Sequence, residues 1–154
     1  MSEEINEFER DHTDDFGFSL ETRKWLSGWL SGGVEITTLP SIVVSECKEY
    51  LPDTSEQLRL YKALTENDVL DENNSIFTSD KPSSWTHTIS VAQEWFKTDR
   101  PVVSVVVGNG NILIDTTQLD PNYIQNVLGG YPDEHEVILL PGTYRVTIVG
   151  DEER

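Results

Sequence analysis

The apolar positions in the first third of the chain repeat with the period of an α-helix. Between residues 19 and 30 they fall three and four positions apart, at Trp25, Leu26, Trp29 and Leu30. Ser31-Gly32-Gly33 then supplies a helix stop. A second amphipathic helix is predicted from Pro40, which suits a first helical turn, to the residue before Pro52. We expect both helices to pack on the structure that the following residues form.

Beyond residue 55 the pattern changes to runs of β-branched and aromatic residues. Such runs favour strands, and the sequence predicts them at residues 58–64, 75–78, 102–107, 112–114, 137–140 and 144–149. The turn sequence Gly108-Asn109-Gly110-Asn111 predicts that the third and fourth of these strands form a hairpin. The stretch 65–83 is otherwise rich in Asp, Asn and Ser, which is typical of a long loop.

Two more helices are predicted between the strands. Ser90 and Gln93 have the spacing of a capping box, and Asp120-Pro121 is a typical helix start. The expected buried positions are Val91, Ala92, Trp95 and Phe96 in the first helix and Ile124, Val127 and Leu128 in the second. Together the elements predict an α+β fold, with a mainly antiparallel β core, two inserted helices and two N-terminal helices.

The length of 154 residues suits one domain, and no internal repeat divides it. We expect that domain to span residues 16–150, between a flexible acidic arm at 1–15 and a tail at 151–154. The net charge of −17 comes in large part from these two ends. The remainder is still acidic, which argues against binding to nucleic acid or to an anionic membrane.

Cys47 is the single cysteine, which excludes an internal disulfide and fits a reducing, cytoplasmic compartment. It lacks clustered His or Cys partners, so we expect a core residue and no metal site. His12 and His87 likewise have no identifiable partners in the sequence. No apolar run approaches the ~20 residues of a membrane span, and acids occupy the N-terminus where a signal peptide has Lys or Arg.

The stretch Tyr131-Pro132-Asp133-Glu134-His135-Glu136 leads directly into a buried apolar run. If these residues continue the strand, Glu134 and Glu136 project from one face with Cβ atoms roughly 6.6 Å apart, while His135 points the other way. Two carboxylates at that spacing suit the stabilisation of a cation beside an acceptor group. Taken alone, Glu-x-Glu in so acidic a chain is typical of an ordinary acidic loop before a strand.

Two further features change that interpretation, namely a cation in the strand near 59–62 and Ser84-Trp85-Thr86 before a helix. With Glu134-His135-Glu136 they resemble, in this order, the Arg-Ser-Glu class of mono-ADP-ribosyltransferases, which includes clostridial-type toxins and phage-encoded enzymes. Ser84-Trp85-Thr86 matches the Ser-Thr-Ser motif of the family, and Glu134-His135-Glu136 matches its catalytic Glu-x-Glu. The resemblance covers residues 55–150, the expected catalytic core, and implies an ADP-ribosyltransferase-like split antiparallel β core.

The resemblance implies an enzyme that transfers ADP-ribose from NAD to a protein arginine and releases nicotinamide. Glu136 would stabilise the oxocarbenium ion and accept a hydrogen bond from the ribose 2′-hydroxyl. Ser84 would hold Glu136 in position, and Thr86 would complete that support. Trp85 would flank the nicotinamide ring, although an aromatic side chain at such a position is more often part of the core.

The acceptor side of the site is expected before the second Glu. In the family, Glu two positions before the catalytic Glu accompanies an arginine acceptor, so Glu134 would orient and polarise the guanidinium. Tyr131 would stack on the acceptor side chain. His135, on the opposite face, is expected to lie at the surface or to pack, and not to act as a general base.

The cation expected to bind the NAD phosphate is ambiguous. The family shows an aromatic residue followed by Arg, and the matching dipeptide here is Tyr61-Lys62. Arg59 lies three residues before Lys62, so the two face opposite ways in a regular strand. Arg59 offers the bidentate fork that phosphate geometry favours, and a bulge would let it serve; Lys62 offers a point charge at the aligned position. On this chemistry Arg59 is preferred and Lys62 is nearly equal, and the interpretation that both are surface cations also stays open.

Other functions compete with this one. NAD glycohydrolase activity would use the same site with water as acceptor, and paired carboxylates also serve in hydrolases of other glycosidic bonds. A non-enzymatic alternative is an acidic interaction or inhibitor protein that mimics nucleic acid, although many of its acids lie in the tails. We expect a cytoplasmic monomer of the phage or bacterial effector type, with NAD as substrate, no metal, and a protein bearing the target arginine as partner.

Overall fold

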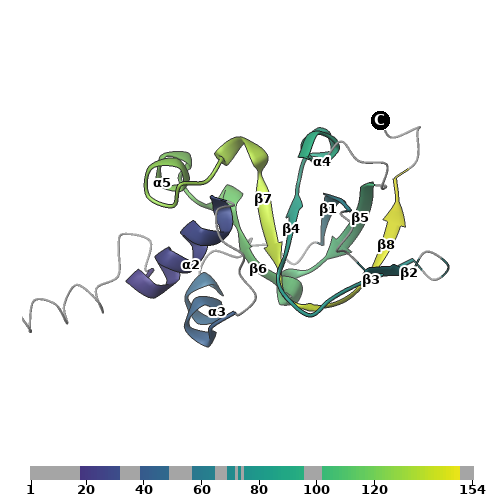
Figure 1. The fold of residues 1–154 in the computed structure, drawn as a ribbon, viewed down its shortest axis with the longest axis horizontal. Coiled ribbons are helices and arrows are strands. Elements are labelled where there is room, and N and C mark those ends of the chain that lie inside the picture. The colour runs from purple at the N-terminus through teal and green to yellow at the C-terminus, as the bar shows by residue number, and fades with distance from the viewer. Residues whose placement is uncertain are drawn as a thin grey trace, which may run out of the picture.

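The structure is a computed structural model that describes residues 18–31, 39–48, 57–64, 69–71, 73, 75–95 and 102–149 (Figure 1). Several predictions lie outside these ranges: the acidic arm at 1–15, the helix stop at Gly32-Gly33, the helix end before Pro52, the burial of Phe96 and the tail at 151–154. The side chain of Trp95 is also outside the described part.

The predicted α+β class is confirmed by one antiparallel sheet of eight strands with short helices beside it. The strands lie in the order β2-β3-β8-β5-β1-β4-β7-β6. Their bounds are β1 Leu58–Ala63, β2 Val69–Asp71, β3 Ile76–Ser79, β4 Ser83–Thr86, β5 Val102–Val107, β6 Ile112–Asp115, β7 Glu136–Leu139 and β8 Gly142–Ile148. The strand predicted at 75–78 is present as β3, and the described part of the stretch predicted as a long loop also contains the short strand β2.

Strand β8 joins two halves of the sheet. Its residues 142–145 pair with β3, whereas its residues 146–148 pair with β5. The alternation of buried and exposed residues in β8 places Tyr144 and Val146 in the same core as Phe77 of β3 and Val105 of β5. One strand therefore carries a continuous core from one half of the sheet to the other.

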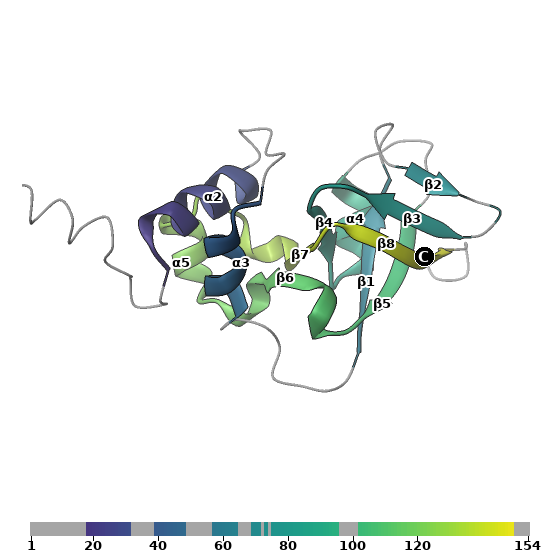
Figure 2. The same ribbon diagram turned by 90° about the horizontal axis from the view of Figure 1, so that it is seen from below.

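Three of the helices gather at one end of the sheet. They are α2 (Leu20–Leu30), α3 (Ser41–Cys47) and α5 (Pro121–Asn126), and Figure 2 shows them beside β6 and β7, away from β3, β5 and β8. Helix α4 (Ile89–Trp95) follows β4 and lies near β1. The starts of α2 and α5 agree with the sequence: the side chains of Ser19 and Asp120 accept hydrogen bonds from the first-turn N–H groups of Thr22 and Asn122.

Two main cores lie on the two sides of β7. Leu26 and Leu30 of α2, with Cys47 of α3, pack against Ile138 and the neighbouring strand β6. Val137 and Leu139 face the other way, into a core that contains Leu60 and Trp85. The expectation that Cys47 is a core residue is confirmed, and its burial raises the thiol pKa to about 12.

The predicted hairpin between residues 102–107 and 112–114 is wrong. β5 pairs with β1 and β8, and β6 pairs with β7. A two-residue hairpin turn needs positive φ angles, yet Gly108 has a φ of −103° and residues 109–111 form a 3-10 turn. With both edges of β5 occupied by other strands, the chain leaves the strand and crosses to the far edge of the sheet.

Two details of the inserted helices also differ from the prediction. α4 begins at Ile89, and the N–H groups of Val91 and Ala92 bond to the carbonyl of Thr88, so Ser90 is inside the helix and does not cap it. Val127 is 49% exposed, and Tyr123 takes its place in the core. Within the described ranges no helix is long and apolar enough to cross a membrane.

Candidate functional site

The three strands that carry the predicted motifs are neighbours in the sheet, in the order β1-β4-β7. Tyr61 of β1 is in register with Thr86 of β4, and Thr86 with Glu136 of β7. Antiparallel pairing places side chains of paired residues on the same face, so Ser84, Thr86 and Glu136 share one face of the sheet. Ser84 and Glu136, which are 52 positions apart in the sequence, thus lie side by side on this face.

The carboxylate of Glu136 is the centre of the site. Its Oε2 atom accepts a hydrogen bond from Ser84 Oγ at 2.6 Å and another from Trp29 Nε1 at 2.9 Å. The same Trp29 N–H lies 2.8 Å from Ser84 Oγ, so the three groups form a closed triangle. Glu136 is only 7% exposed, and both hydrogen bonds from the described residues go to one oxygen of its carboxylate.

Burial raises the pKa of Glu136 from its ordinary 4.5 to about 7, because the charged form loses water. The hydrogen bonds from Ser84 and Trp29 lower the pKa and oppose this effect, as does the positive charge of Lys62. The nearby charge of Glu134 raises it. At neutral pH the carboxyl group is therefore close to half protonated.

The prediction that Glu134 and Glu136 lie on one face of a strand is wrong. Glu134 ends a 3-10 turn, Pro132–Glu134, and β7 begins only at Glu136. Between them His135 has a φ of 49° and a ψ of 46°, a left-handed conformation that breaks the alternation of a strand. Thr86 Oγ1 donates to the carbonyl of Glu134 at 2.7 Å and so fixes the turn to β4.

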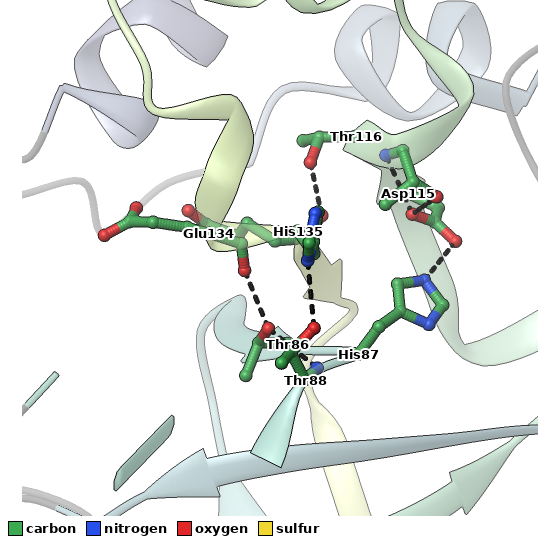
Figure 3. A network of polar contacts seen from close by, with 9 residues as sticks. Thr86, His87, Thr88, Asp115, Thr116, Glu134 and His135 are labelled. Atoms are coloured by element: carbon green, nitrogen blue, oxygen red, sulfur yellow. Dashed lines mark hydrogen bonds and ion pairs between the residues drawn. The ribbon is translucent and has the colours of Figure 1, made fainter. Parts of the chain in front are cut away.

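His87 has a partner that the sequence analysis did not find. Its Nε2 lies 2.7 Å from Oδ2 of Asp115, the last residue of β6, and this contact raises the pKa of His87 (Figure 3). Asp115 is 1% exposed, and its Oδ1 also accepts from the N–H and hydroxyl of Thr117. An Asp followed by Thr at the end of an apolar strand is typical of such a turn, so the sequence did carry a signal for Asp115.

His135 is exposed, as expected, and belongs to the same network. Its Nδ1 lies 2.9 Å from the hydroxyl of Thr88 (Figure 3). Its carbonyl accepts a hydrogen bond from the N–H of His87. Thr116 Oγ1 donates to the carbonyl of Glu136 at 2.7 Å. These contacts tie the turn before Glu136 to the ends of both β4 and β6.

Of the two candidate cations, only Lys62 is linked to Glu136. Its Nζ donates to the backbone carbonyl of Ser84 at 3.3 Å, and its charge lowers the pKa of Glu136. Arg59 is exposed and donates instead to Ser104 Oγ of β5 at 3.2 Å. Tyr61 packs on the small cluster that includes Ala63 and the α4 helix.

Two residues expected to contact NAD are buried. Trp85 is fully buried, lies edge-on to Phe77 with ring centroids 5.4 Å apart, and donates from Nε1 to Ser83 Oγ. Strand alternation turns it away from the face of Ser84, so it cannot flank a bound nicotinamide. Thr86 is also fully buried, and its hydroxyl supports Glu134 and the helix start at Thr88.

A cleft of about 1060 Å³ lies beside the turn, between α5 and the residues before β7. Tyr131, Asp133 and Glu134 line one side of it, and Leu119 and Gln125 are among the residues on the other. Tyr131 is 61% exposed. Glu136 does not line this cleft, so the two predicted Glu residues serve different surfaces.

Trp29 is a second residue of the site, besides Asp115, that sequence reasoning missed. Its spacing from Trp25, Leu26 and Leu30 predicts a core position on an amphipathic helix, and nothing in that spacing indicates a hydrogen bond to a residue 107 positions away.

Among the described residues no cluster of three or more His, Cys, Asp or Glu side chains could hold a metal ion. Comparison with known proteins adds no relative: no family model, no curated protein and no solved structure matches this chain.

Proposed function

We propose that the chain is an ADP-ribosyltransferase-like enzyme that transfers ADP-ribose from NAD to a protein arginine. The observation that carries the proposal is the 2.6 Å hydrogen bond between Ser84 Oγ and Glu136 Oε2, made by two motifs that the sequence alone selected. The adjacency of the motif strands β1, β4 and β7 supports the same fold, as does the division of the sheet at β8.

The chemistry follows from the charge that develops in the reaction. The bond between nicotinamide and the anomeric carbon breaks, nicotinamide leaves as a neutral molecule with the bonding electrons, and the ribose becomes an oxocarbenium ion. Glu136 in its ionised form stabilises that cation, and its burial makes the stabilisation stronger than water can give. A guanidinium nitrogen of the acceptor then bonds to the anomeric carbon, and the proton that this nitrogen loses passes to the Glu134 carboxylate or to water.

Lys62 is the cation that we assign to the anionic substrate, because its charge acts on Glu136 and Arg59 points to β5. Its Nζ donates a hydrogen bond to the backbone carbonyl of Ser84 at 3.3 Å. An ammonium group presents a point charge and makes no bidentate fork. Loss of Lys62 should therefore weaken NAD binding more than loss of Arg59.

The cleft lined by Tyr131, Asp133 and Glu134 is the proposed acceptor side. Two carboxylates and an exposed aromatic ring suit a cationic side chain such as arginine. Glu134 is two residues before Glu136 and its charge raises the pKa of Glu136, so we assign the arginine acceptor to the Glu134 side of this cleft.

The test is incubation of the full chain with labelled NAD and either an arginine-rich protein or a bacterial lysate. Glu136→Gln should abolish both protein labelling and NAD hydrolysis, whereas Glu134→Gln should lose labelling and keep hydrolysis. Glu94→Gln, at an exposed position on α4, is the matched control and should match the unaltered chain. Labelling that survives Glu136→Gln, or an unaltered chain that neither labels protein nor cleaves NAD, would refute the proposal.

A further inference from the structure

Helix α2 contributes a side chain to a site that the sequence motifs place entirely in residues 55–150. Trp29 Nε1 lies 2.9 Å from Glu136 Oε2 and 2.8 Å from Ser84 Oγ, so one N–H is shared between the two motif residues. Leu26 and Leu30, on the same helix, are buried in the core that contains Ile138 of β7. The helix is thus fixed to the strand that carries Glu136.

The indole ring of Trp29 is held by more than its hydrogen bonds. It stacks on the ring of Trp25, one helical turn earlier, with centroids 5.3 Å apart and an interplanar angle of 13°. Stacked aromatic pairs contribute attraction beyond the area that they bury. The donor that faces Glu136 is therefore positioned before any ligand arrives.

The direction of each hydrogen bond in the triangle is determined by one fact, that an indole N–H can only donate. Ser84 Oγ accepts from Trp29, so its own proton points at Glu136 Oε2. Oε2 is then the final acceptor of both donors. Among the described residues no donor bonds to Oε1, so a proton that Glu136 takes up goes to Oε1, and this oxygen remains for a substrate hydroxyl.

We propose that Trp29 is a positioning residue: its N–H fixes Oε2 of Glu136 and orients the Ser84 hydroxyl, so that Oε1 is presented to the substrate. The assignment rests on the proposed function of the Glu136 site and extends it to the N-terminal helix. The site is then incomplete without α2, even though every family-like motif lies outside that helix.

The first test needs no turnover. In the ¹⁵N-labelled full chain, each of the four Trp residues gives one indole N–H resonance, and single Trp→Phe variants assign them. The Trp29 resonance should shift with pH with a midpoint near 7, where Glu136 titrates, and the shift should vanish in Glu136→Gln. A Trp29 resonance that does not respond to pH, or that responds equally in Glu136→Gln, would overturn the proposal even if Trp29→Phe fails to fold.

The second test is kinetic. Trp29→Phe keeps a ring to stack on Trp25 but removes the N–H, and it should lower kcat for NAD cleavage at least about tenfold. KM for NAD should stay within about twofold, because the lost interaction acts on the reacting carboxylate. The pH at which activity reaches half its maximum should rise by about one unit, since a donor that lowers the pKa of Glu136 is gone.

Trp25→Phe is the matched control, because it alters the same stack and leaves the Trp29 hydrogen bonds in place. It should keep the pH midpoint of the unaltered chain. Equal pH midpoints for Trp29→Phe and the unaltered chain would overturn the proposal. If the unaltered chain turns over no NAD while the Trp29 resonance still follows Glu136, the proposed function fails and the positioning of Glu136 by Trp29 stands.

Discussion

At the scale of the residue, Glu136 is a group whose burial weakens the fold. In water a glutamate side chain is ionised at neutral pH, but burial raises the pKa of Glu136 and so favours its protonated form. Ser84 and Trp29 offset part of that cost without removing it. Such a position is typical of groups retained for chemistry, since an apolar or neutral side chain would serve the core better.

Replacement of Glu136 by Gln should therefore stabilise the protein above neutral pH. Because folding raises the pKa of Glu136 from 4.5 to about 7, the folded state binds the proton more tightly than the unfolded chain. The contribution of Glu136 to the free energy of unfolding is therefore fully present below pH 4.5, and it is lost as the pH rises through about 7. At pH 8 the variant should unfold at higher urea, with a gain of up to roughly 3 kcal/mol.

Urea unfolding at acidic and at alkaline pH measures this effect. The advantage of Glu136→Gln should be small at the acidic end, where the native side chain is protonated in both states. Glu94→Gln should show no comparable dependence on pH. A native chain that is as stable as Glu136→Gln at pH 8 would show that the carboxylate is not buried in the way described.

At the scale of the element, the turn before β7 is held from both sides. β7 lies between β4 and β6, and the pair His87 and Asp115 spans from the end of one neighbour to the end of the other. Thr86 and Thr116 add hydrogen bonds to the backbone of Glu134 and Glu136. These contacts hold the backbone on both sides of the left-handed His135.

His87→Gln tests this bridge through its dependence on pH. The contact with Asp115 raises the pKa of His87 above 6.5, so its contribution to stability is fully present below 6.5 and is lost as the pH rises through the raised value. The loss of unfolding free energy in His87→Gln should therefore be larger at pH 6 than at pH 9. In an Asp115→Asn background that difference should disappear, and a difference that persists there would place the partner of His87 elsewhere.

Helix periodicity and strand propensity predicted most of the elements, because the apolar residues that are buried on one face recur in the sequence at the spacing of a helix or a strand. The start of α5 followed from Asp120-Pro121, whereas the cap of α2 by Ser19 is a finding of the structure. The pairing of β5 with β1 could not be predicted, since a turn that resembles a hairpin says nothing about which edges are already occupied. The adjacency of Ser84 and Glu136 was predictable only through a family pattern, and Trp29 had no pattern to mark it.

At the scale of the whole molecule, the site lies where the helical end meets the sheet. Strand β7 separates two cores. Its Ile138 faces the core under α2, α3 and α5, and its Val137 faces the core on the opposite side of the strand. Glu136, at the start of that strand, receives Ser84 from the sheet and Trp29 from the helical end. The geometry of the carboxylate therefore depends on how the two parts pack together.

Gly130 controls that packing, because α2 and α5 approach each other over its bare Cα. A Cβ at this position would lie 2.9 Å from Leu30 Cβ and 3.1 Å from Ile124 Cγ2. Leu30 is the residue after Trp29, so relief of the clash moves the helix that carries the indole. Gly130→Ala should lower stability by about 1–3 kcal/mol and weaken the contact of Trp29 with Glu136.

Thermal unfolding and the pH response of the Trp29 indole resonance measure the two effects in one sample. Gly108→Ala is the matched control, because its Cβ would meet nothing within 4 Å and its φ of −103° is open to alanine. It should change neither observable. If Gly130→Ala unfolds at a lower temperature and yet keeps the native Trp29 titration, α2 and α5 can separate without disturbing the site, and the dependence of Glu136 on the helical end would be disproved.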